Sequence, residues 1–167
     1  MHKSWVHEGG ISTPLIVNWP KGIAARGEFR RTPGHVIDLV PTLLELAGGT
    51  ASPTWNGATA PPLPGRSLVP ALAHDVPVAR DFLFFSHYDN HALREGDWKL
   101  AATRADPNAW QLFDLAKDRS ETVDLAAQQP DRVRQMAARW QQLDTQYRRE
   151  SGVDLLPKPK PRKRAGR

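Results

Sequence analysis

The segment at residues 14–20, with the sequence PLIVNWP, constrains the fold more than any other feature of this chain. It is a short apolar run bounded by prolines, which is typical of a strand buried on both faces of a parallel sheet. Such a strand needs neighbours, because its backbone groups must be hydrogen-bonded and its side chains covered. Residues 1–50 contain no earlier strand–helix unit that could pair with it. The sequence therefore predicts the end of a larger α/β domain that is cut just before residue 1.

The first half of the chain also predicts short helices joined by loops. Residues 35–47 carry apolar side chains at helical spacing and end at a Gly-Gly pair, which is a helix-terminating signal. Pro41 lies inside this pattern, so the helix begins near it or bends there. Residues 50–66 are rich in turn formers and predict a loop. Residues 67–73 predict one helical turn capped by Ser67.

The second half changes to a pattern of short strands followed by one helix. Tight links at residues 88–90 and 95–97 predict hairpins and hence an antiparallel meander. A final helix is expected from Pro130, and it is the available cover for one face of the meander. The strands are expected at residues 81–87, 91–94, 98–103 and 110–113, and the apolar stripe of the helix consists of Val133, Met136, Ala137, Trp140, Leu143 and Tyr147.

Composition excludes several classes of protein. The chain has no Cys, which excludes disulfides, thiolate metal sites and a Cys nucleophile. Of its 23 Lys and Arg residues, six lie in residues 157–167, and the other 17 nearly balance the 18 acidic residues. We therefore expect a disordered basic tail and no specific binding of nucleic acid. No run of 18 apolar residues is present, so no membrane span is predicted.

Five blocks of sequence resemble type I sulfatases, which are arylsulfatase-like enzymes with an alkaline-phosphatase-like fold. They occur in the order of that family and extend from about residue 3 to residue 148. The blocks are KSWVHEGGISTPLI at residues 3–16, DLVPTLLELAG at 38–48, GRSL at 65–68, ALREGDWKL at 92–100, and LFDL at 112–115 with Asp118 and Glu121.

The resemblance implies that the whole domain belongs to the α/β fold class. The fragment by itself would be classified as α+β. The implied organisation is the end of the catalytic α/β domain, a Pro/Gly-rich connection, a subdomain of four antiparallel strands covered by a C-terminal helix, and a basic tail. The corresponding ranges are residues 1–50, 51–80, 81–150 and 151–167.

The resemblance implies hydrolysis of sulfate esters by a formylglycine beside a bound divalent metal, usually calcium. The formylglycine arises in a Cys/Ser-x-Pro-x-Arg motif. The nearest string here, residues 12–16 (STPLI), ends in Ile where Arg is required, so the nucleophile is absent. The family's metal ligands would lie before residue 1. Asp89 and Asn90 resemble a metal-binding pair but are interpreted as a hairpin turn. His87 and His91 flank Asp89 without a third ligand, so no metal site is predicted.

Lys3 matches the family lysine that contacts a sulfate oxygen, with Glu8 five residues later. A fixed ammonium group stabilises the negative charge that spreads over the oxygens during sulfate transfer. His87, Asn90 and Arg94 are further candidates for contact with the non-sulfate part of the substrate, and Arg94 offers bidentate recognition of an anion. We expect the chain alone to be inactive, because its partner is the missing N-terminal catalytic portion.

Two alternatives remain open. One is a stand-alone module that binds anions or sulfated glycans through the tail and the meander. The other is a fragment of a phosphatase or phosphonate hydrolase of the same superfamily. The resemblance implies a sulfated small molecule or glycan as the substrate and leaves open whether the sulfate is on an aryl group or a carbohydrate. A periplasmic or secreted location follows from family habit alone.

Overall fold

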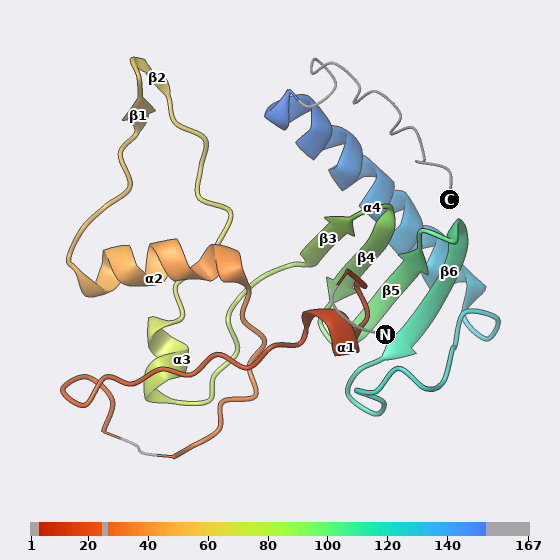
Figure 1. Ribbon diagram of the computed structural model, residues 1–167, viewed down its shortest axis with the longest axis horizontal. Helices are drawn as coiled ribbons and strands as arrows, with labels where there is room; N and C mark the ends of the chain where they lie inside the picture. Colours follow the sequence, from red (N-terminus) through yellow and green to blue (C-terminus); the bar gives the residue numbers. More distant parts are fainter. Residues whose placement is uncertain (1–3, 25–26, 153–167) are drawn as a thin grey trace, which may run out of the picture. The chain divides into compact units, whose positions relative to one another are not determined.

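The computed structural model describes residues 4–24 and 27–152 (Figure 1). It divides into two compact units, Met1–Ser12 with Phe84–Arg167, and Thr13–Leu83. We call them the sheet unit and the helical unit. The predicted sulfate-contacting residue Lys3 and the cations of the basic tail lie outside the described residues. Within the described ranges, no helix is both long and apolar enough to cross a membrane.

The sheet unit is built on four strands in the order β3-β4-β5-β6, and the predicted antiparallel meander is confirmed (Figure 1). Leu93 on β4 lies opposite Leu100 on β5, and Leu100 lies opposite Leu112 on β6. All three leucines are fully buried, so this register keeps one apolar row in the core. The strands are β3 Leu83–His87, β4 Asn90–Glu95, β5 Trp98–Thr103 and β6 Asp106–Asp114.

The hairpin between β3 and β4 turns on Tyr88 and Asp89, whose φ angles are 48° and 59°. Two consecutive positive φ angles match the right-handed twist of the flanking strands. The interpretation of Asp89 as a turn residue rather than a metal ligand agrees with this backbone. Asn90 is already the first residue of β4, and it is buried.

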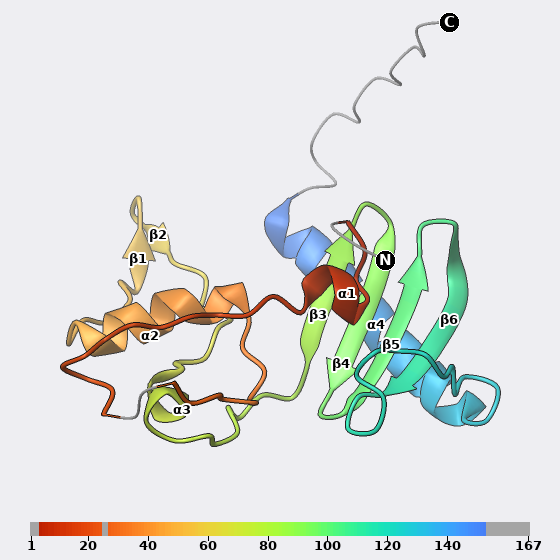
Figure 2. The same ribbon diagram turned by 60° about the horizontal axis from the view of Figure 1, so that its bottom comes forward.

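Helix α4, Pro130–Ser151, covers one face of the sheet, as predicted (Figure 2). Met136 and Trp140 from its apolar stripe are buried. The Trp140 ring stacks on Phe84 with 5.5 Å between the ring centroids, and its Nε1 donates a hydrogen bond to the Phe85 carbonyl oxygen at 3.2 Å. Trp140 therefore joins the helix to the sheet by both packing and hydrogen bonding.

The N-terminal segment covers the opposite face of the sheet, which the sequence did not predict. It contains the short helix α1, Glu8–Ile11, which lies in front of the strands in Figure 2 while α4 crosses behind them. Val6, just before α1, is buried with Ala92, Ala101, Phe113 and Leu115. Both faces of the meander are thus covered, and the second cover comes from residues far away in the sequence.

The helical unit is organised by one buried carboxylate. Asp38 accepts hydrogen bonds from the backbone N–H groups of His35 and Arg66, both at 2.8 Å, and from the Arg80 guanidinium at 2.6 Å. Three separate stretches of chain are therefore fixed by one side chain. The elements are the 3₁₀ turn η1 Val36–Asp38, α2 Leu39–Leu46, β1 Thr54–Trp55, β2 Ala58–Thr59 and α3 Val69–Ala73.

The predicted buried strand at residues 14–20 is wrong for this structure. The segment has no strand pairing, and Leu15, Ile16 and Val17 are 57%, 88% and 44% exposed. Trp19, expected in the core, is also exposed. The physical reason is the one that made the segment informative: a strand forms only against a neighbour. The loop expected at residues 50–66 contains the small β1–β2 hairpin, which closes on Asn56 and Gly57, both with positive φ.

We expect His91 to make the stability of the sheet unit dependent on pH. Its ring lies 4.1 Å from the Trp140 ring, and burial lowers its pKa although Asp144 and Asp89 oppose the shift and Arg148 adds to it. A histidine with a lowered pKa stays neutral in the fold while the unfolded chain takes up a proton below its usual pKa of 6.5, so stability falls as the pH drops below that value.

We expect His91→Phe to flatten this dependence, because it keeps an aromatic ring and removes the titrating group. The measurement is the melting temperature of both proteins between pH 7.5 and about pH 5, a range that brackets the pKa of free histidine. The wild-type value should fall relative to the variant towards acid pH. Parallel curves would show that His91 does not carry the dependence.

Candidate functional site

The segment that follows Lys3 packs tightly on the sheet. The chain turns at α1, where the Gly10 N–H donates to the His7 carbonyl oxygen at 2.7 Å. A Cβ atom at Gly10 would lie 2.2 Å from the Trp5 carbonyl oxygen, so only glycine permits this backbone path. In the Glu-Gly-Gly sequence, the second glycine, Gly10, is therefore required by the path of the backbone.

A buried ion cluster holds Glu8 beneath this turn. Lys99, the second residue of β5, is 0% exposed, and its Nζ lies 2.9 Å from Glu8 Oε1 and 2.8 Å from Glu121 Oε1. The Glu8 backbone N–H donates to Glu121 Oε2 at 2.6 Å. An ammonium group removed from water is tolerated only when it is paired, and here two carboxylates pair it. We call Glu8, Lys99 and Glu121 the anchor cluster.

The turn that carries Glu121 is itself held in an uncommon conformation. The φ angle of Glu121 is 55°, which is rare for a residue other than glycine. Asp118 accepts from the Thr122 and Val123 N–H groups at 2.7 and 2.8 Å. The Val123 N–H makes the largest contribution to lowering the pKa of Asp118. This carboxylate closes the turn that directs Glu121 to Lys99.

Two arginines, Arg119 and Arg94, lie beside the anchor cluster. Arg119 lies 3.6 Å from Glu8 Oε2 and donates to Ser12 Oγ at 3.2 Å. Arg94 on β4 lies opposite Lys99 in the β4–β5 register. Burial lowers the pKa of the Arg94 guanidinium, Glu8 and Asp97 oppose this shift, and Arg119 adds to it. Arg94 thus lies within electrostatic range of Glu8.

Asn90 fastens the beginning of the same segment. Its Nδ2 donates to the carbonyl oxygens of Ser4 at 2.9 Å and His87 at 3.0 Å, and its Oδ1 accepts from the Arg104 N–H at 3.1 Å. Both polar atoms of this buried side chain therefore bind backbone. Ser4 directly follows Lys3, so Asn90 acts one residue from the predicted sulfate contact.

The predicted site residues fall into two groups. Asn90 and Arg94 lie on the β4 face that the N-terminal segment covers, and they flank it at Ser4 and Glu8. His87 ends β3, where its exposed ring lies 4.4 Å from the Tyr88 ring. Lys99 and Glu121 are not among the site residues predicted from the sequence, although a lysine inside the otherwise apolar run 98–102 is a signal of buried charge pairing.

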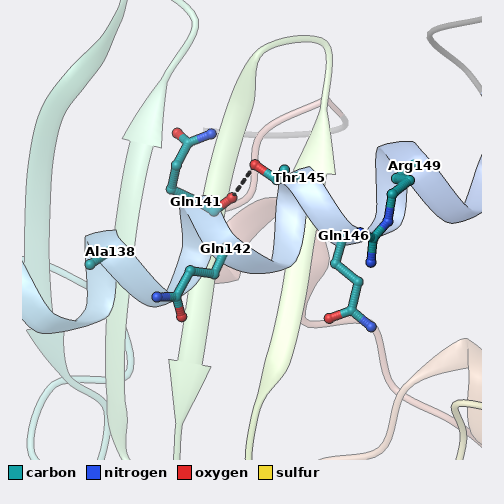
Figure 3. Close-up of a pocket in the computed structure, with 6 residues that line it drawn as sticks. All are labelled: Ala138, Gln141, Gln142, Thr145, Gln146 and Arg149. Carbon is teal, nitrogen blue, oxygen red and sulfur yellow. Dashed lines mark hydrogen bonds between the residues drawn. The ribbon is translucent and has the colours of Figure 1, made fainter.

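The described residues do not fit a metal. No group of three or more His, Asp or Glu side chains within residues 4–24 and 27–152 could hold an ion. The hollow shown in Figure 3 lies along α4 and offers amides and one guanidinium rather than acid–base pairs. Its only drawn hydrogen bond joins Thr145 Oγ1 to the Gln141 carbonyl oxygen at 2.8 Å, and the lining consists of Ala138, Gln141, Gln142, Thr145, Gln146 and Arg149.

This chain is similar in sequence to sulfatases, and a solved structure shares its fold. The family model for N-sulphoglucosamine sulphohydrolase, C-terminal, matches residues 1–148. An uncharacterized sulfatase of Schizosaccharomyces pombe is 28% identical over 94% of this chain and 28% of its own length. A choline-sulfatase of Rhizobium meliloti is 35% identical over 71% of this chain and 22% of its own. The crystal structure of Ps i-CgsB shares the fold with a TM-score of 0.59 at 24% identity, over 75% of this chain and 27% of that one.

These matches place the molecule among the C-terminal portions of type I sulfatases. The chain belongs to the family described as N-sulphoglucosamine sulphohydrolase, C-terminal. It spans about a quarter of the length of the curated relatives it matches. The sequence resemblance to a sulfatase is therefore confirmed.

Proposed function

We propose that this chain works as the C-terminal part of a sulfatase that hydrolyses an aryl or carbohydrate sulfate ester. The observation that carries the proposal is the family match over residues 1–148, which includes the Lys3-to-Gly10 segment together with the strands that hold it. Relatives carry the names arylsulfatase K and choline-sulfatase, and both names describe cleavage of a sulfate ester.

In this proposal Lys3 supplies the ammonium group that contacts the sulfate. The group stabilises the charge that develops on the sulfate oxygens only if it is held in place before the reaction. Calcium and formylglycine belong to the proposal as groups provided from outside this chain. His87 and Arg94 are proposed to contact the rest of the substrate, and Arg94 suits an anionic substituent. Asn90 belongs to the same predicted set.

The proposed partner is the N-terminal catalytic portion of a sulfatase. The helical unit exposes more apolar side chains than a surface with no partner would favour. They occur in the segment at residues 14–20 and along α2. Burying them against an α/β portion would remove this surface from water, and they are Leu15, Ile16, Val17, Trp19, Leu39, Val40, Leu43 and Leu46.

The test is an aryl sulfate assay with calcium. The chain alone should give no turnover, because the nucleophile motif is absent. The chain joined to an upstream portion with a formylglycine-bearing Cys/Ser-x-Pro-x-Arg motif should turn over the ester. In that joined protein, Lys3→Ala should lower kcat/KM by roughly 100- to 1000-fold, the range for losing one group that stabilises developing charge. Turnover by the chain alone, or an active Lys3→Ala protein, would contradict the proposal.

A further inference from the structure

We propose that Asn90 and the anchor cluster are positioning residues that hold the segment carrying Lys3 in its working place. This inference rests on the proposed function, in which the held segment carries the lysine that contacts the sulfate. The four side chains come from α1, β4, β5 and the turn after β6. Together they grip residues 4–8 at both ends.

The first grip is at Ser4. The Asn90 amide donates to its carbonyl oxygen at 2.9 Å, and Asn90 is itself fixed by the Arg104 N–H and by the β3–β4 hairpin. Ser4 directly follows Lys3 in the sequence, so this hydrogen bond lies one residue from the proposed sulfate contact.

The second grip is at Glu8. Its side chain pairs with the fully buried Lys99 at 2.9 Å, and its N–H donates to Glu121 at 2.6 Å. Between the two grips, His7 Nε2 lies 3.1 Å from Gln111 Oε1, and Val6 is buried against the sheet. The segment is therefore bound to the sheet unit at Ser4, Val6, His7 and Glu8.

The anchor cluster is an unusual choice if stability were its only purpose. Burying charges costs solvation energy that a well-packed apolar set avoids, so buried ion pairs are weak sources of stability. Glu121 also carries an uncommon φ of 55° to reach Lys99, and such backbone persists only where its surroundings enforce it. Directional pairing, in contrast, fixes the position of Glu8 in a way that apolar contacts cannot.

The first experiment needs no enzyme activity and uses the whole 167-residue chain. Amide hydrogen exchange is measured at Glu8, whose N–H donates to Glu121, and at Gly10 and Ile11, whose N–H groups donate to the His7 carbonyl oxygen. Exchange on β5 is the internal reference. The variants are Lys99→Met and Asn90→Asp, the latter keeping the acceptor for Arg104 while losing the donor to Ser4. The triple variant E8Q/K99M/E121Q removes all three charges together. Arg139→Met is the control, since it removes an ion pair between α4 and Glu95 of β4 and leaves the anchor cluster intact.

We expect Lys99→Met to accelerate exchange of the segment amides by at least about 100-fold more than that of β5, the scale of breaking a buried pair. Asn90→Asp should act in the same direction. The triple variant should regain the stability lost in Lys99→Met while the segment still exchanges fast. Arg139→Met should leave the ratio of segment to β5 exchange unchanged. Equal acceleration of exchange in the segment and in β5 would overturn the inference, because the cluster would then contribute to global stability alone. No acceleration would also overturn it, because the cluster would then not hold the segment.

A second experiment uses the joined, active protein described above. A residue that acts through Lys3 has no effect once Lys3 is gone, so Lys99→Met should lower kcat/KM in the wild-type background and change it less than about twofold in the Lys3→Ala background. Additive effects would overturn the positioning role. If the joined protein shows no sulfatase activity, the proposed function fails, whereas the exchange result still decides whether the segment is held.

Discussion

Asp38→Asn is expected to lower the free energy of unfolding of the helical unit by roughly 3–5 kcal/mol, the cost of leaving a buried charge unpaired. The Asp38 carboxylate is fully buried, and the Arg80 guanidinium that it pairs with at 2.6 Å is mostly buried. The amide cannot balance that charge, and one of its two heavy atoms can no longer accept from backbone N–H groups. Urea titration followed by the amide signals of α2 measures the change.

Acid pH provides an independent check of the same carboxylate. Burial opposes its ionisation, but hydrogen bonds from Arg80 and from the Arg66 and His35 N–H groups lower its pKa overall. A lowered pKa means stability that is complete above the ordinary value of 3.8 and is lost as the pH falls through the folded value. The difference in the free energy of unfolding between wild type and Asp38→Asn should therefore shrink as the pH falls below 3.8. Glu45→Gln, an exposed change on the adjoining helix α2, is the matched control, and an equal loss in both variants would contradict the role of Asp38.

Trp140→Ala should destabilise the sheet unit by a similar amount, roughly 3–5 kcal/mol, because it leaves a cavity under α4. The indole packs on Phe84, His91 and Trp110, and it loses its hydrogen bond to Phe85. Loss of α4 packing should expose one whole face of the meander. Thermal unfolding followed by circular dichroism and by the amide signals of β5 measures the effect.

Gln141→Ala is the control for Trp140, since it truncates the neighbouring exposed side chain on the same helix. It should change the free energy of unfolding by less than about 0.5 kcal/mol. Trp140→Phe should fall between the two, because it retains an aromatic ring but loses the N–H donor. A small effect of Trp140→Ala would mean that α4 is held chiefly by other contacts.

The sheet unit could be predicted largely from local sequence signals. The antiparallel order of the strands, the hairpin turns and the start of α4 at Pro130 depend on neighbours in sequence, and the structure confirms them. The predicted strand bounds are less accurate, since β6 begins at Asp106, four residues before the predicted strand at residues 110–113. The cover on the second face could not be predicted in this way. Glu8 and Lys99 are separated by 91 positions, and no periodicity links residues so far apart.

The failed strand at residues 14–20 has a different cause. Its composition indicates burial, but burial depends on a neighbour that these described residues do not supply. For the candidate site, the predicted residues were Lys3, His87, Asn90 and Arg94, and their roles stay predictions. The anchor cluster emerged only from the coordinates, because a carboxylate and a lysine in sequence do not reveal which pairs are buried together.

The order in which the ribosome delivers these pieces has a consequence for assembly. The chain leaves the ribosome from its N-terminus, so residues 4–12 emerge long before the strands that bury Val6 and neutralise Glu8. Glu121 comes 113 positions after Glu8, which makes closure of this contact a late, long-range step. A nascent polypeptide interrupted before residue 121 would lack the carboxylate that pairs with Lys99 and accepts from the Glu8 N–H, so a stop codon ahead of that position should leave residues 4–8 without this contact.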